Sequence, residues 1–171
     1  EAFESVFGAG WERLGLQQVY DVAHNIAKFE PYRVDGQMRT LCVHRKGATR
    51  AFPAGHPGVP DLYREVGQPV FIPGDMGRAS WVLVGAPGSI ERSFGTTCHG
   101  AGRAMSRKAA KKDVAGRSIG DELERQGILA RARSRKGLDE EQPNAYKSVD
   151  KVVEVVHRAG LSRKVARLRP L

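Results

Sequence analysis

The pattern of apolar and polar residues predicts three short strands in the first half of the chain. Residues 70–72 form a continuous apolar run with turn-forming residues after it, which is typical of a buried strand. Residues 40–44 and 80–84 are rich in residues that strands prefer. Residues 53–60 contain three prolines and two glycines, which favour a loop. Turns are expected at residues 44–47, 73–77 and 86–89.

A helix is predicted near the end of the sequence, where valines recur at helical spacing. Ser148 suits the N-cap position, Asp150 lies in the first turn, and Gly160 follows the last turn as a C′ residue. His157 and Arg158 place cations near the helix C-terminus, where the helix dipole favours them. The expected buried stripe consists of Val149, Val152, Val153 and Val156.

Two other segments favour helices by composition. Residues 103–112 consist largely of good helix formers, and residues 119–126 form a short helical pattern that Gly127 ends. Residues 131–144 are charged and polar and contain Gly137 and Pro143, so we expect a loop there.

Two interpretations compete for the first thirty residues. A helix that ends before Pro31 is predicted by an apolar face at Leu16, Val19, Tyr20, Ala23 and Ala27. The alternative is a strand followed by a loop at residues 21–24.

The predicted elements mix helices and strands without a regular β-α-β alternation, which favours an α+β fold. A length of 171 residues fits one domain. The sequence contains no apolar run of about 18 residues, and its first ten residues lack the basic and apolar regions of a signal peptide. We therefore expect no membrane partner.

The charge balance indicates a polyanionic partner. The chain carries 28 Lys and Arg against 19 Asp and Glu, a net charge of +9, which favours nucleic acid; a basic enzyme without a nucleic-acid substrate is the alternative. Cys42 and Cys98 are far apart and form no disulfide framework, so a reducing cytoplasm is expected.

The segment from His99 to Arg103, HGAGR, is the main candidate for chemistry. Its glycines allow a close approach of the backbone to an anion, particularly where a helix begins. A neutral imidazole is a competent nucleophile towards phosphate. Arg103 and Arg107 lie four residues apart and would share one helix face. A tight turn with a hydrogen-bonded histidine is the alternative.

Three further segments carry weaker signals. His24, beside Asn25 and near Asp21, suits a metal ligand with supporting polar groups, or an ordinary histidine. Residues 44–50, HRKGATR, suit phosphate contact or a solvated loop. The loop at residues 73–77 with Ser80 suits a nucleotide pocket, in which Asp75 or Ser80 bonds a base edge, or a plain connection between strands. A Cys98–His99 metal site is disfavoured, because adjacent residues rarely point at one atom.

Five stretches in register change this picture: DVAHNIAK (21–28), HRKGATRAF (44–52), PGDMGRASWVLVG (73–85), CHGAGRAMSR (98–107) and the segment 145–171. Together they resemble the RtcB family of GTP- and Mn²⁺-dependent RNA ligases, which splice tRNA and repair broken RNA. The resemblance runs from about residue 15 to the end. It implies that residues 1–171 are the C-terminal portion of a single catalytic domain.

The resemblance also implies a reaction sequence. A histidine attacks the α-phosphate of GTP and releases pyrophosphate, so that GMP is held covalently on the imidazole. GMP then passes to an RNA 3′-phosphate, opened from a 2′,3′-cyclic phosphate, and the 5′-hydroxyl of a second RNA displaces it. Each step is phosphoryl transfer, in which positioning and charge neutralisation dominate. The RNA partner would be tRNA halves or broken RNA, with archease as a possible assisting protein.

The family's roles map onto particular residues here. The resemblance implies that His99 carries GMP and that His24 binds manganese. The nucleotide would contact Asn25, Pro73, Gly74, Asp75, Met76, Ser80, His99, Gly100, Ala101, Gly102 and Tyr146. Arg103 and Arg107 would hold RNA phosphate.

The sequence also departs from the family pattern. Many members have serine where this chain has Asp75, although an aspartate would accept hydrogen bonds from guanine N1–H and N2–H₂ together. The cysteine, aspartate and further histidines that complete the family's metal site are not in these 171 residues, so little ligase activity is expected from them alone.

Three other functions stay open at this point. The first is a non-catalytic basic RNA-binding module, against which the aromatic content of 7% counts. The second is an inactive fragment that lacks metal ligands. The third is a metal-dependent phosphodiesterase that uses His24, His44 and His99. The sequence does not fix the oligomeric state, for which a monomer is the working expectation.

Overall fold

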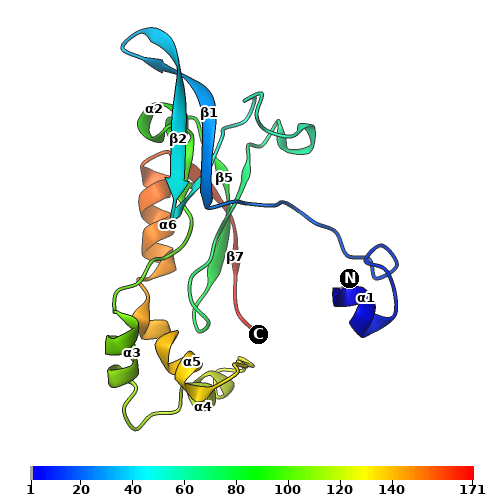
Figure 1. The fold of residues 1–171 in the computed structure, drawn as a ribbon, viewed down its shortest axis with the longest axis vertical. Coiled ribbons are helices and arrows are strands. Elements are labelled where there is room, and N and C mark those ends of the chain that lie inside the picture. Colours follow the sequence, from blue (N-terminus) through cyan, green and yellow to red (C-terminus); the bar gives the residue numbers. More distant parts are fainter. Residues whose placement is uncertain (1) are drawn as a thin grey trace.

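The computed structural model describes residues 2–171, and within them it contains helices and antiparallel sheets (Figure 1). The helices are α1 (Ala2–Phe7), α2 (Gly88–Ser93), α3 (Arg107–Asp113), α4 (Ile119–Glu124), α5 (Arg135–Glu140) and α6 (Val149–Arg158), with 3₁₀ turns at Asp61–Tyr63 and Pro143–Ala145. The strands are β1 (Asn25–Val34), β2 (Gln37–Lys46), β3 (Ala48–Arg50), β4 (Pro69–Ile72), β5 (Ser80–Gly85), β6 (Thr96–Cys98) and β7 (Ser162–Leu168). The predicted α+β class is confirmed.

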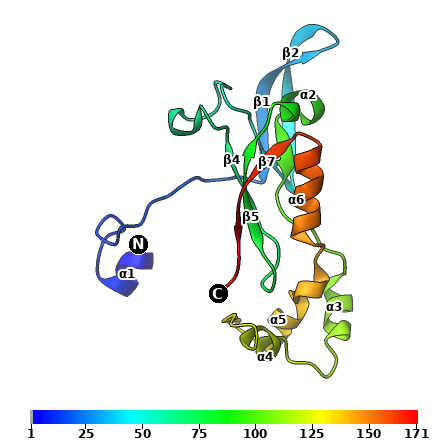
Figure 2. The same ribbon diagram turned by 180° about the vertical axis from the view of Figure 1, so that it is seen from behind.

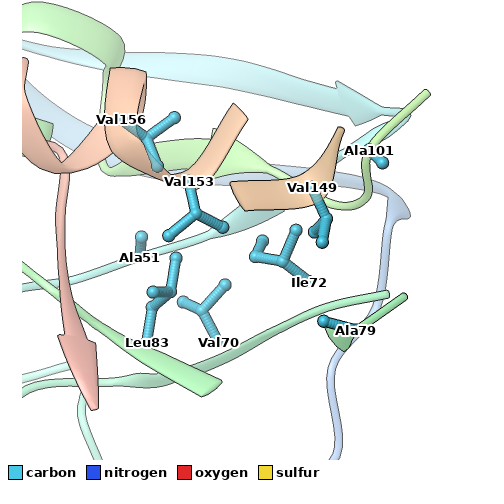
Figure 3. Packing of buried hydrophobic residues seen from close by; sticks show 9 residues of the cluster. All are labelled: Ala51, Val70, Ile72, Ala79, Leu83, Ala101, Val149, Val153 and Val156. Atoms are coloured by element: carbon cyan, nitrogen blue, oxygen red, sulfur yellow. The ribbon is translucent and has the colours of Figure 1, made fainter. Parts of the chain in front are cut away.

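The main core lies between α6 and the three-stranded sheet β4-β5-β7 (Figure 2). Three valines of α6, Val149, Val153 and Val156, face the sheet residues Leu83, Ile72 and Val70 (Figure 3). Val152, predicted in the buried stripe, is only half-buried. Burial of apolar side chains on both surfaces stabilises this contact. The helix begins as predicted, because the Ser148 side chain accepts a hydrogen bond from the Lys151 N–H. It ends before Gly160, whose φ is +70°.

The hairpin β1–β2 is the main departure from the sequence predictions. All ten residues of β1 pair antiparallel with β2, and residues 16–24 form no helix. The predicted helix that ends before Pro31 is therefore wrong. The turn at Asp35 and Gly36 has φ values of +51° and +78°, the conformation that joins hairpin strands tightly. Pro31 is tolerated opposite Thr40, because β1 is an edge strand.

A buried ion pair joins the two strands of the hairpin, and its arginine fixes the hairpin to the body. Arg45 donates to both oxygens of Glu30, at 3.0 Å and 2.7 Å. Its guanidinium also donates to the Phe94 carbonyl at 2.9 Å and to Thr96 Oγ1 at 3.0 Å. The Tyr32 hydroxyl lies 2.7 Å from the same carbonyl and 2.8 Å from Glu30 Oε2. The predicted turn at residues 44–47 therefore begins later, since Arg45 belongs to β2 and is buried.

Helices α3, α4 and α5 share a second small core, built from Val114, Ile119, Leu123 and Ile128. The loop expected at residues 131–144 is wrong for α5, whose N-cap is Ser134 and whose Leu138 packs on this core. Helix α3 begins at Arg107 rather than at residue 103, because Arg103 forms a β-bridge with Tyr146. Within residues 2–171, no helix is both long and apolar enough to cross a membrane.

Candidate functional site

The structure brings together the two histidines that the sequence singles out. Their rings stack, with 4.8 Å between the centroids of His24 and His99 and an angle of 27° between the planes. His24 immediately precedes β1, and His99 immediately follows β6. The Gly47 N–H donates to the His24 carbonyl at 3.0 Å, and β3 pairs Ala48 with Cys98. These backbone bonds hold the two histidines together.

Gly47 allows this arrangement at the sharp turn between β2 and β3. Its φ is +65°, which glycine adopts without strain. A Cβ built at this position would lie 3.5 Å from His99 Nε2, so the glycine backbone forms part of the wall beside that ring. Burial, and then the neighbouring His24 ring, lower the pKa of His99 below its ordinary 6.5.

The loop after His99 is joined to the loop after β4. The Ala101 N–H donates to the Pro73 carbonyl at 3.0 Å. Gly74 lies against the chain that returns to β5, since a Cβ there would be 2.0 Å from the Ala79 carbonyl oxygen. Only glycine fits in this position. The Gly74 N–H also lies 3.4 Å from Ser80 Oγ.

The loop after β4, residues 73–79, is the second loop of the site. It is also the cavity loop, because it lines a cavity of about 440 Å³, a volume in the range of small-ligand sites. Five predicted nucleotide-binding residues lie together in its wall: Pro73, Gly74, Asp75, Met76 and Ser80. Four further residues complete it: Phe71, Leu168, Arg169 and Pro170. His99 and Ala101 are not in the lining, but the Pro73–Ala101 bond joins their loop to it.

Both carboxylate oxygens of Asp75 have partners within the protein. Oδ1 accepts from the Gly77 N–H at 3.0 Å, and Oδ2 accepts from Arg78 Nε at 2.6 Å. The Asp75 side chain is 0% exposed. In this conformation Asp75 shapes the loop, and its buried carboxylate can contact a guanine base only if the loop rearranges.

Arg78 connects the cavity loop to the segment around Tyr146. Beyond Asp75, its guanidinium donates to the Tyr146 carbonyl at 2.9 Å and to the Pro143 carbonyl. The Tyr146 ring lies under the Arg103 guanidinium, 4.9 Å from its carbon to the ring centroid. Tyr146 is thus near the second loop, although it does not line the cavity.

The two predicted RNA-phosphate residues both contact the segment Glu140–Glu141. Arg103 donates to Glu141 Oε2 at 3.1 Å and to the Glu140 carbonyl at 2.6 Å. Arg107 lies 3.4 Å from a carboxylate oxygen of each glutamate and is 67% exposed. They do not lie on one helix, since α3 begins at Arg107. Arg107 is the more accessible cation, and Arg103 reaches a ligand only by exchanging a protein partner.

The described residues 2–171 contain no cluster of three or more His, Cys, Asp or Glu side chains that could hold a metal ion. His24 and His99 form a pair without a third ligand. His44 lies on β2 opposite Ala27, and no ring contact joins it to either histidine within these residues. A tight divalent-metal site needs more ligands than this pair supplies.

The sequence analysis did not identify three residues that lie near the site. Gly47 was visible as a turn glycine, but its place beside His99 depends on the β3–β6 pairing. Arg78 carries no motif signal, and its role follows from contacts 65 and 68 residues away. Arg169 reaches the cavity because β7 pairs with β5, and β7 was not predicted.

Comparison with known proteins gives a consistent match. The family model described as tRNA-splicing ligase RtcB matches residues 1–171. Curated proteins named tRNA-splicing ligase RtcB are 58% identical over 171 residues in Thermococcus kodakarensis and in Archaeoglobus fulgidus, and 55% identical in Pyrococcus abyssi. All of this chain is covered in each case, but it spans only 36%, 36% and 19% of those relatives.

Proposed function

The chain belongs to the RtcB family of tRNA-splicing ligases, and we propose that it supplies the nucleotide-accepting histidine of a GTP- and Mn²⁺-dependent RNA ligase. The ligase would join RNA 2′,3′-cyclic phosphate or 3′-phosphate ends to 5′-hydroxyl ends. Because the chain spans about a third or less of these relatives, this activity is proposed for a protein that contains the chain.

One observation carries the proposal: the Pro73–Ala101 hydrogen bond joins the cavity loop to the histidine loop. A nucleotide with its base in the cavity would extend its phosphates towards His99 along this junction. Gly100 and Gly102 keep the backbone free of side chains there, and a Cβ at Gly102 would meet nothing within 4 Å. Such a glycine-lined path suits a phosphate chain.

The covalent step assigned to His99 is a phosphoryl-group substitution. A neutral imidazole nitrogen of His99 attacks the α-phosphorus of GTP, so that an N–P bond forms. The bond between this phosphorus and the bridging oxygen breaks, and pyrophosphate leaves with that electron pair. The half-buried His99 ring keeps its orientation through the stacked His24 and the adjacent Gly47.

The other residues are proposed to bind and orient. Asn25 directly follows His24 and would contact the nucleotide beside it. Tyr146, which Arg78 joins to the second loop, would approach the base from beside that loop. Arg107 offers its exposed guanidinium to RNA phosphate, and Arg103 joins it when Glu141 is exchanged for phosphate.

His24 is proposed as one manganese ligand. The residues of this chain do not complete such a site, so the remaining ligands would come from outside it. Manganese, when bound, would neutralise phosphate charge and orient the phosphates.

A chimera tests the proposal without assuming that the chain acts alone. The chain would replace the matching 171 residues of the Thermococcus kodakarensis relative, to which it is 58% identical. The chimera would be incubated with α-labelled GTP and Mn²⁺, and label bound to protein would be counted. Label is expected in the chimera and absent from its His99→Ala variant.

The matched control is His157→Ala, which removes an exposed histidine of α6. This variant is expected to label like the parent chimera. Label that survives His99→Ala, or equal losses in both variants, would remove His99 from the proposed role.

A further inference from the structure

The outer face of the β1–β2 hairpin is an exposed surface that the proposed nucleotide site does not use. The hairpin projects beyond the rest of the fold in both views (Figures 1 and 2). Side chains alternate across a strand, so every second residue faces outwards. The outer face consists of the pairs Asn25–Lys46, Ala27–His44, Phe29–Cys42, Pro31–Thr40 and Arg33–Met38, all of them exposed.

An aromatic ring stands at the centre of this face. Phe29 is 79% exposed, and Met38 nearer the tip is 62% exposed. Large apolar side chains at such exposure on a rigid strand are suited to contact with a ligand. The fold itself gains little from Phe29, because its ring packs into neither apolar core.

The charge of the outer face is of one sign. It carries Arg33 and Lys46 but no carboxylate. Among the described residues, neither Arg33 nor Lys46 forms an ion pair; Arg33 only donates to the Gly36 carbonyl at 3.2 Å. Cations on either side of an exposed aromatic ring suit single-stranded nucleic acid, whose phosphates pair with the cations while a base stacks on the ring.

The face is continuous with the candidate site and is held in place. Its first pair, Asn25–Lys46, directly adjoins His24 and Gly47. The inner face is fixed to the body by hydrogen bonds from Arg45 and Tyr32 to the Phe94 carbonyl and from Arg45 to Thr96, so the outer face does not turn inwards. Ten paired positions at a rise of about 3.3 Å per residue extend about 30 Å from the histidines.

We propose that the outer face of the β1–β2 hairpin binds the single-stranded RNA segment that leads to the reacting end, with one base stacked on Phe29. The choice of RNA rests on the proposed function. The backbone phosphates would lie along Lys46 and Arg33, and the reacting end would lie at the root of the hairpin, beside His24 and His99.

RNA affinity measured by fluorescence anisotropy tests this proposal, with chimeras as above that carry either the parent chain or a variant of it. The probe is a labelled single-stranded RNA of about 12 nucleotides with a 3′-phosphate. Phe29→Ala is expected to weaken binding about fivefold or more, since loss of one stacked base has that size. Phe29→Trp is expected to retain the affinity, whereas Phe29→Leu, which is apolar but cannot stack, is expected to lose it. Affinity is expected to fall with added salt.

The matched control is Phe7→Ala, which removes another exposed phenylalanine, 61% exposed on α1; its affinity is expected to equal that of the parent chain. Unchanged affinity in Phe29→Ala, full affinity in Phe29→Leu, an equal loss in Phe7→Ala, or no RNA binding by the parent chain would each overturn the proposal. Full affinity in Phe29→Leu would mean that no base stacks on this ring. GMP attachment to His99 is measured separately, so failure there counts against the proposed function alone.

Discussion

The buried pair between Glu30 and Arg45 is expected to control the stability of the hairpin and of the histidine site behind it. Glu30→Gln removes the negative charge with almost no change in volume, so no cavity contributes to the effect. Arg45 has 0% side-chain exposure and would then keep a buried positive charge without a counter-charge. Phe94 and Thr96 would still accept hydrogen bonds from it.

The expected loss of unfolding free energy in Glu30→Gln follows from these contacts. Removing one partner of a buried ion pair typically costs about 3–5 kcal/mol. The two remaining acceptors of Arg45 place this variant near the lower end, at roughly 3 kcal/mol. For a chain of this length that corresponds to a fall in Tm of roughly 6–12 °C. The double variant Glu30→Gln/Arg45→Met leaves no unpaired charge and should be more stable than the sum of the two single variants.

Urea denaturation followed by circular dichroism would measure the free energy of unfolding of the parent, both single variants and the double variant. The surface control is Asp61→Asn, because Asp61 pairs with Arg64 at 2.7 Å but its side chain is 93% exposed. This control should lose about 1 kcal/mol or less. A loss in Glu30→Gln no larger than in Asp61→Asn, or strict additivity in the double variant, would refute the reasoning.

Three further predictions concern pH, the cavity loop and the last helix. Burial raises the pKa of Glu30, but hydrogen bonds from Arg45 and Tyr32 and the charges of Arg45 and Arg50 outweigh it, so the pKa lies below 4.5. The stability that this pair contributes is therefore complete above pH 4.5 and is lost as the pH falls below it. Urea titrations at several pH values should show this loss in the parent but not in Glu30→Gln. Gly74→Ala places a Cβ 2.0 Å from the Ala79 oxygen, so it should cost about 2–3 kcal/mol of unfolding free energy and weaken GTP binding. The control is Gly120→Ala in α4, where a Cβ meets nothing closer than 3.9 Å; it should raise the unfolding free energy by at most about 1 kcal/mol. Equal effects of the two substitutions would contradict the packing argument. Ser148→Ala removes the N-cap of α6 and should cost about 1 kcal/mol of unfolding free energy; a neutral result would show that the cap contributes nothing.

Local patterns predicted the elements whose signals are contained in a few neighbouring residues. Residues 70–72 and 80–84 became β4 and β5, and the last helix begins at its serine and ends before its glycine. The strand predicted at residues 40–44 is part of β2. Strand β1 and its pairing were missed because apolar residues up to Ala27 recur at helical spacing, while the Asp35-Gly36 turn that signals the hairpin lies beyond Pro31. β7 was missed because its alternating charged residues become a strand only by pairing with β5.

In the candidate site, too, local features were predictable from the sequence and long-range contacts were not. The glycine loops were visible in the sequence, and the resemblance assigned nucleotide contacts to five residues that line one cavity. The stacking of His24 on His99 joins residues 75 positions apart and depends on strand pairing. The inward turn of the Asp75 carboxylate depends on Arg78, which no motif marked.

The central claim is that the His99 imidazole accepts GMP, and mass spectrometry of the chimera after incubation with GTP and Mn²⁺ tests it most directly. The account predicts one GMP on the peptide that contains His99, through an N–P bond that acid cleaves and alkali spares. GMP on any other residue, or an adduct that withstands acid, would contradict it.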